Sequence, residues 1–218
     1  MKILSILIAS LFSINSIAQS FEGSISFDVL NGNSGEKGTM IWHTKNNKHR
    51  IDYNTELEGQ TLNYSLFLFD ESTDVFLLTE NNGQKFLTKL DLNEIENKYK
   101  GLEEARMEKT NEKTNFQGYE SNKLTFKSPY FRANCWVSNH QDFKDLRMPK
   151  TLSKTGMNFL LSKNNVNEFP LEILAKDDEG NILFMQSVFK IEKKSVADDV
   201  FNFNNFNQAQ PELDVDFE

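Results

Sequence analysis

The sequence has a single cysteine and fewer positive than negative charges, and each of these features excludes a class of protein. Cys135 is the only cysteine, so no disulfide can form within the chain, and its place beside Trp136 in an alternating segment indicates a buried structural thiol. The chain has 24 Lys and Arg against 32 Asp and Glu. An acidic chain without a basic stripe is a poor ligand for nucleic acid, which we exclude as a partner.

Recognisable catalytic and metal-binding motifs are also absent. The three histidines, His43, His49 and His140, do not have the spacing of a metal box. The acidic run 177–180 has its glycine at the wrong offset for a calcium loop and indicates a hairpin turn. We find no glycine-rich phosphate loop and no nucleophile elbow. The sequence therefore predicts no metal, no cofactor and no enzyme, and a hydrolase would require one of these histidines to meet carboxylates in a cleft.

The first eighteen residues have the pattern of an export signal. Lys2 is followed by an apolar run over residues 3–12 and by the small-x-small site Ser16-Ile17-Ala18. The apolar run is about half as long as a membrane-spanning helix. We expect residues 1–18 to be a removable signal peptide. The expected product is periplasmic or secreted and soluble, in a Gram-negative envelope, with no transmembrane span and no lipid-bearing N-terminal cysteine.

Alternation of apolar and polar residues predicts antiparallel strands along most of the chain. In segment 21–29, the alternation places Phe21, Ile25, Phe27 and Val29 on one buried face and leaves the other face wet. Further strands are predicted over residues 40–44, 49–53, 62–69, 75–79, 84–90, 107–110, 114–116, 122–127, 132–138, 171–175 and 182–192.

Helical signals are few. Asp91 and Glu94 form a capping box for a short helix over residues 91–101, which Gly101 would end. Residues 152–163 show weak helical periodicity around Gly156, and Asn111-Glu112 is expected to be a hairpin turn. The sequence predicts one domain over residues 19–207, followed by an acidic, disordered tail over residues 208–218.

Phenylalanine is unusually frequent, with 19 residues in the chain. In Leu66-Phe67-Leu68-Phe69 both faces of the predicted strand are apolar, so both faces need a cover. Two interpretations follow. The core has an aromatic bias, or a curved sheet encloses an apolar cavity that accepts a lipid or acyl chain. The residues expected to line such a cavity are Phe67, Phe69, Phe76, Phe126, Trp136 and Phe189.

Several short motifs are shared with one protein family. They are Phe21-x-Gly23-x-Ile25, His49-Arg50-Ile51-Asp52, Phe116-x-Gly118-Tyr119, Trp136-Val137-Ser138, Phe169-Pro170-Leu171 with the Gly180 turn, and Val196-Ala197-Asp198-Asp199-Val200-Phe201. Together with the export signal, they resemble an exported family of unknown function grouped with the LolA/LolB-like lipoprotein carriers. The resemblance spans the whole predicted domain. It differs at Ser121, where family members often carry a cysteine.

The resemblance implies a mainly β (α+β) fold: a strongly curved antiparallel sheet, or open half-barrel, closed by one or two short helices. Residues 91–101 and 148–164 are then the lid helices. In the carriers the cavity receives acyl chains. We expect a non-enzymatic envelope protein that binds an apolar ligand or lipid under the sheet. The alternative is an envelope protein–protein interaction module with a filled core, and the oligomeric state stays open.

Overall fold

The computed structural model describes residues 21–32, 34–69, 74–81, 84–91, 100–144, 146, 156–203 and 207–208. These residues form one 12-stranded sheet with a few short helices. The first six strands are β1 (Gly23–Asn31), β2 (Glu36–Lys45), β3 (Lys48–Leu57), β4 (Gln60–Phe69), β5 (Val75–Asn81) and β6 (Gln84–Leu90). The next five are β7 (Arg106–Phe116), β8 (Tyr119–Lys127), β9 (Arg132–Ser138), β10 (Phe169–Lys176) and β11 (Ile182–Lys193).

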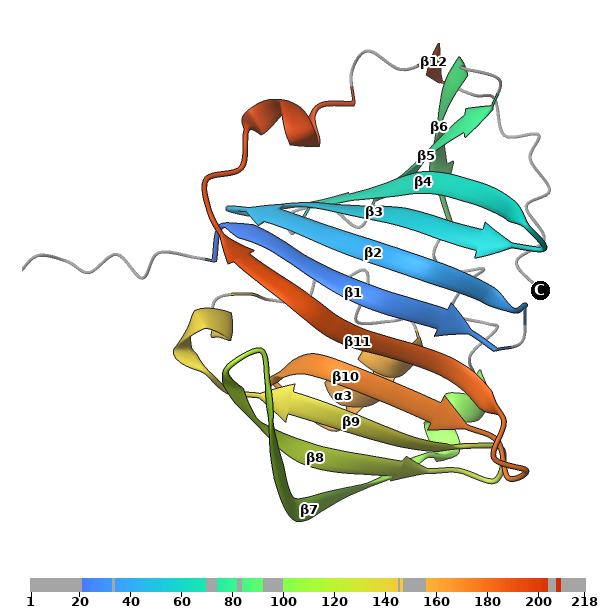
Figure 1. Ribbon diagram of the computed structural model, residues 1–218, viewed down its shortest axis with the longest axis vertical. Helices are drawn as coiled ribbons and strands as arrows, with labels where there is room; N and C mark the ends of the chain where they lie inside the picture. Colours follow the sequence, from blue (N-terminus) through green and yellow to red (C-terminus); the bar gives the residue numbers. More distant parts are fainter. Residues whose placement is uncertain are drawn as a thin grey trace, which may run out of the picture.

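The sheet consists of two antiparallel meanders that meet at its centre. With the short strand β12 (Asn207–Gln208) included, the strand order is β12-β6-β5-β4-β3-β2-β1-β11-β10-β9-β8-β7, so β1 to β6 form one meander and β7 to β11 form the other (Figure 1). The two halves join where β1 pairs with β11, with Ile25 opposite Ile191. β12 (Asn207–Gln208) adds a short parallel pairing to β6 at one edge.

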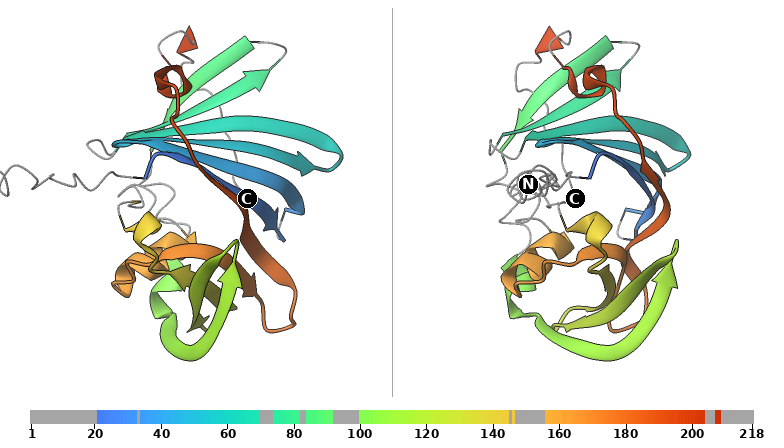
Figure 2. Two further views of the ribbon diagram at one scale, coloured as in Figure 1. Left: turned by 60° about the vertical axis from the view of Figure 1, so that its left-hand side comes forward. Right: turned by 90° about the vertical axis from the view of Figure 1, so that its left-hand side faces the viewer.

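The sheet curves strongly, and two of its helical segments lie on the inner side of the curve. Figure 2 shows η2 (Gln141–Phe143) and α3 (Gly156–Lys163) inside the arc of strands, while η4 (Asp198–Phe201) lies outside it. Phe143 packs into a core with Ile25 and Trp42, whereas Leu160 packs into a second core with Phe126. The sheet is open, and the fold predicted from the sequence, a curved half-barrel with few helices, is confirmed.

β1 is covered on both faces along its first half. Ile25 and Phe27 are buried as expected from their alternation, but Ser24 and Ser26 are buried as well. The Ser24 hydroxyl donates to Glu192 of β11 across the strand pair. The expected solvent-exposed face of β1 therefore begins only at Asp28, whose side chain is exposed.

Two local predictions are wrong. Residues 107–116 form one continuous strand, β7, instead of a hairpin, and its register shifts between Lys109 and Lys113. The expected turn at Asn111-Glu112 is this bulge, where Thr110 accepts from the Glu112 amide. Gly101 does not end a helix, because it lies inside the 3₁₀ turn η1 (Lys100–Glu104).

Several predicted segments lie outside the described residues. These are the signal peptide at 1–18, residues 92–99 of the first lid helix and residues 148–155 of the second. The second lid is described from Gly156 onward, where α3 begins as a true helix. Residues 209–218 of the predicted tail are also outside the described residues. Gln208, the first residue of that tail, lies in β12 and pairs with Leu87 of β6. None of the described helices has the length and apolar character needed to cross a membrane.

A segment after β11 crosses the outer face of the sheet. Lys45 donates to the Val196 carbonyl at 2.8 Å, and an Arg50 guanidinium nitrogen donates to the Val200 carbonyl at 3.1 Å. Phe201, within η4, is buried. We call residues 194–203 the C-terminal strap. It fixes the outer face of β2 and β3 through main-chain acceptors.

Candidate functional site

The inner face of β1 to β6 is almost free of charge. The cross-strand register places Ile25, Trp42, Ile51, Leu66 and Leu77 in one row across five strands. The adjacent row consists of Phe27, Met40, Tyr53, Tyr64 and Thr79. Glu36 is the only acidic or basic residue, apart from the buried His49, that this register puts on the described inner face of these six strands.

Part of this inner face is covered by packing and part remains accessible. Near β1, Phe169 stacks on Phe143 with centroids 4.9 Å apart and on Trp42 at 5.8 Å. Farther toward β4, Leu66 is only half-buried and Leu62 is 36% exposed. The inner face thus changes from a closed aromatic core near β1 to a partly open apolar surface over β3 and β4.

A polar group marks one end of the accessible surface. The Thr55 hydroxyl donates to Glu36 Oε1 at 2.6 Å, and the Tyr64 hydroxyl lies 3.5 Å from the same oxygen. The rings of Tyr53 and Tyr64 stack with centroids 4.6 Å apart and planes 15° from parallel. Burial, the neighbouring Tyr53 and the Glu36 carboxylate all raise the pKa of Tyr64, so its hydroxyl stays protonated as a donor.

The two tyrosines meet because of a tight hairpin that was not predicted from the sequence. β3 and β4 are joined by Glu58-Gly59, both with positive φ, of 51° and 79°. This is the geometry of a two-residue type I′ turn, and it sets the register in which Tyr53 faces Tyr64. The sequence does contain a signal for this pairing: Tyr53 precedes Glu58 by as many positions as Tyr64 follows Gly59, so a two-residue turn there places the tyrosines opposite each other.

The structure divides the six predicted cavity residues among three places. Phe67, Phe69 and Phe76 lie together, but on the outer face, where each ring is 5.1 to 5.8 Å from that of Phe203. The strap residue Phe203 thus covers the second apolar face of β4. The sequence correctly indicated that both faces need a cover, but these three residues face away from the inner surface.

The other three predicted residues are separated from this cluster. Phe126 is fully buried in the core beneath α3. Trp136 is half-buried on the opposite face of β9, where its ring contacts Phe116 and the Lys123 ammonium. Phe189 lies at the irregularity of β11 and is 41% exposed. The expectation of one shared cavity for all six therefore requires correction.

Two hollows lie over the outer face of the first meander, and both have mixed linings. One of about 330 Å³ is bordered by residues that include Arg50, Asp52 and Lys85. The other, of about 630 Å³, is bordered by residues that include Asp28, Lys37 and Met185. None of the six predicted residues lines either hollow. Their borders contain charges of both signs, which is typical of a solvated sheet face.

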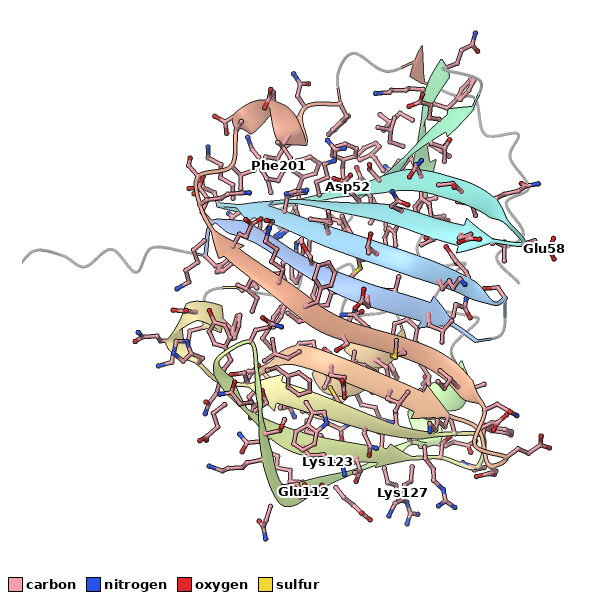
Figure 3. All side chains as sticks on the ribbon, viewed as in Figure 1. Asp52, Glu58, Glu112, Lys123, Lys127 and Phe201 are labelled. Atoms are coloured by element: carbon pink, nitrogen blue, oxygen red, sulfur yellow. The ribbon has the colours of Figure 1, made fainter. Side chains whose placement is uncertain are left out.

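A carboxylate does meet a histidine on the outer face. Asp52 Oδ2 lies 3.2 Å from His43 Nε2, while Oδ1 accepts from Arg50 at 2.6 Å and from Ser65 at 2.5 Å. Figure 3 labels Asp52 on this face, near the strap residue Phe201. Burial alone would raise the pKa of Asp52, but the bonds from His43, Ser65 and Arg50 hold it below its usual range.

This cluster does not have the geometry of a nucleophilic triad. In a triad the histidine lies between hydroxyl and carboxylate, whereas here Ser65 donates directly to Asp52. A carboxylate with a lowered pKa that already accepts several bonds is a weak base. The cluster therefore fixes β3 and β4 to each other and to the strap through Arg50.

The other two histidines also have structural contacts. His49 is buried, and its Nδ1 accepts from the Trp42 indole at 3.2 Å. His140 caps η2 by accepting from the Asp142 amide. No group of three or more metal-ligating side chains is found in the part of the chain that the structure describes. Ser121, at the position of the missing family cysteine, is fully buried and donates to the Tyr119 carbonyl.

The described residues form a curved, open antiparallel sheet whose inner face over β1 to β6 is nearly uncharged. The chain belongs to the family described as Domain of unknown function (DUF4412), which it matches over residues 21–205. This confirms the prediction of a family of unknown function. No curated protein matches the sequence.

Solved structures show only a distant likeness. An uncharacterized conserved protein from Thermus thermophilus has a TM-score of 0.49 and 9% identity, with 86% of this chain and 89% of that chain covered. PNGF-II has a TM-score of 0.47 and 15% identity, and the match covers 86% of this chain but only 31% of PNGF-II. The complex of Pseudomonas aeruginosa MucA and MucB has a TM-score of 0.40 and 8% identity. That match covers 85% of this chain and 56% of the matched chain. This chain therefore spans about a third of PNGF-II, and TM-scores this low support no argument about function.

Proposed function

We propose that this protein is a non-enzymatic binding protein of the bacterial envelope that holds an apolar ligand, a lipid or acyl chain, against its inner sheet face. One observation carries the proposal: the described inner face of β1 to β6 carries mainly apolar and uncharged side chains, and Glu36 is its only carboxylate. Over β3 and β4 that face keeps half-buried apolar side chains, including Leu66 and Tyr53. Such a surface gains about 0.8 kcal/mol for each ligand CH₂ that it removes from water.

The outer face offers less to an apolar ligand. Its aromatic cluster around Phe67 is already occupied by Phe203 of the strap. The two outer hollows are bordered by charged side chains of both signs. These features favour the inner side as the place where an acyl chain binds.

The alternative of a protein-interaction module would favour an open sheet edge. The edge strand β7 carries a bulge between Lys109 and Lys113. Its charged side chains pair with those of β8, as in Lys123–Glu112 and Lys127–Glu108; Figure 3 labels Glu112, Lys123 and Lys127 along this edge. Bulges and edge charges disfavour the addition of another strand. This edge gives no support to the alternative.

Native mass spectrometry of the purified protein, combined with displacement of a fluorescent fatty acid, tests the proposal. We expect bound lipid in the gas phase and saturable displacement in solution by unlabelled fatty acids and long-chain alcohols. A protein that carries no lipid and does not bind the fluorescent probe would refute the proposal.

A further inference from the structure

Glu36, the single carboxylate on the described inner face of β1 to β6, has no cationic partner among the residues that the structure describes. Glu36 Oε1 is bound by the Thr55 hydroxyl and lies near that of Tyr64. Among the described residues, Oε2 has no hydrogen-bond or ion-pair partner, and no lysine or arginine reaches Glu36. Elsewhere, inner-side Asp142 is paired with Lys193. Glu36 is thus a half-buried carboxylate in which only one of the two oxygens accepts hydrogen bonds from described residues.

The neighbouring aromatic pair supplies a second feature that favours a cation. Tyr53 and Tyr64 stack at 4.6 Å, and the hydroxyl of Tyr64 connects the pair to Glu36. Ring faces attract ammonium groups through their quadrupole, and a carboxylate adds direct attraction. A carboxylate beside two tyrosine rings would repel an anionic head group.

The polar group and the apolar surface are adjacent in the sheet. Tyr53 and Tyr64 share a cross-strand row with Met40, and the next row includes Ile51 and Leu66. With its head group at Glu36, an amphiphile can place its chain along Leu62 and Leu66 of β4, the apolar side chains of this face that stay partly exposed.

We propose that the inner face selects amphiphiles with a cationic, ammonium-type head group, and that Glu36 with Tyr53 and Tyr64 forms the head-group site. This inference rests on the proposed function, since it assigns the head group of the same ligand. The attraction of a partly exposed carboxylate and of two ring faces together predicts a preference of about tenfold over an anionic head.

The test compares three ligands that share one chain: dodecylamine, dodecanol and dodecanoate, each titrated below its micelle concentration against a bound fluorescent probe. We expect dodecylamine to bind about tenfold more tightly than dodecanoate, with dodecanol between them. Glu36→Gln should abolish the difference between amine and carboxylate while dodecanol binds as before. Glu56→Gln, a change on the outer face of the neighbouring strand β3, is the matched control and should leave the preference intact.

A second variant keeps the test decisive if Glu36→Gln is poorly folded. Tyr64→Phe retains the ring but removes the hydroxyl that contacts Glu36, and it should reduce the preference without removing it. Equal binding of all three ligands by the wild type, or tighter binding of dodecanoate, would overturn the head-group inference and leave the proposed function standing. Failure of every ligand to bind would overturn the proposed function itself.

Discussion

Arg50 and Asp52, two residues apart on the outer face of β3, are joined by a bond of 2.6 Å between Arg50 Nε and Asp52 Oδ1. The same guanidinium lies over the Phe67 ring at 5.3 Å and donates to the Val200 carbonyl. This one pair therefore connects β3, the aromatic cluster and the C-terminal strap.

Removing the Asp52 charge should destabilise the fold. Asp52→Asn weakens the bonds from Arg50, Ser65 and His43, and we expect it to lower the free energy of unfolding in urea by about 1–3 kcal/mol. Asp28→Asn is the control, because Asp28 is an exposed carboxylate on the same face and in the same half of the sheet, on β1. Equal effects of the two substitutions would contradict this role for Asp52.

The contribution of Asp52 should depend on pH. Its pKa is lowered in the folded protein, so the folded state binds the proton less well than the unfolded chain, whose value is about 3.9. The stabilisation is fully present above that value and disappears as pH falls through the lower folded pKa. The difference in unfolding free energy between wild type and Asp52→Asn should therefore shrink as the pH of the titration falls below about 4. If the difference in unfolding free energy between the two proteins stayed constant down to the lowest pH, the lowered pKa of Asp52 would not be a source of stability.

The strap should contribute to stability through its aromatic residue. Phe203→Ala removes the ring that contacts Phe67, Phe69 and Phe76. We expect a loss of about 1–3 kcal/mol, measured by urea unfolding. Tyr130→Ala, at a side chain that is 67% exposed, should change stability by less than about 0.5 kcal/mol. If Phe203→Ala behaves like this control, the cluster does not hold the strap.

Binding of the fluorescent fatty acid should be sensitive to the inner face alone. Leu66→Gln introduces an amide on the half-buried inner surface of β4, and we expect the affinity to fall by about tenfold. Asn63→Gln changes an exposed residue of the same strand on the outer face and should not alter it. An outer-face site would give the reverse pattern.

The lone thiol should be unreactive in the folded protein. Cys135 is fully buried, and this burial, followed by the charge of Glu172, raises its pKa. A chromogenic disulfide reagent should therefore label it only at the rate of unfolding, and urea should accelerate labelling to completion. Rapid labelling without denaturant would show that β9 opens locally.

The sequence predicted most of the strands because their alternation is local. Ile25 and Phe27 alternate with polar residues, so their common face is evident from neighbouring positions alone. The bulge in β7 was missed because Thr110 and Glu112 have the composition of a turn, and only the pairing with β8 keeps them in one strand. Pairing between strands is not visible in a local pattern.

The candidate site was less predictable for the same reason. Phenylalanine content identified Phe67 and Phe76 as unusual, but which face they occupy relative to Phe203 depends on a segment more than a hundred positions away. Glu36 gave no signal by itself. Its significance arises because the described inner face carries no other carboxylate, which is visible only after the six strands are placed in register.

The pairing of β1 with β11 has a consequence for the order of folding. β1 emerges first and finds β2 at once, but its second neighbour is the last long strand to be made. The two meanders can each form early from local hairpins, while their union has to wait for the C-terminal part of the chain. Until then, one edge of β1, the strand that carries Ile25 and Phe27, has no partner, and an unpaired strand edge favours aggregation during synthesis. A chain that loses β11 would keep two separate hairpin sheets and never acquire the continuous curve on which its inner face depends.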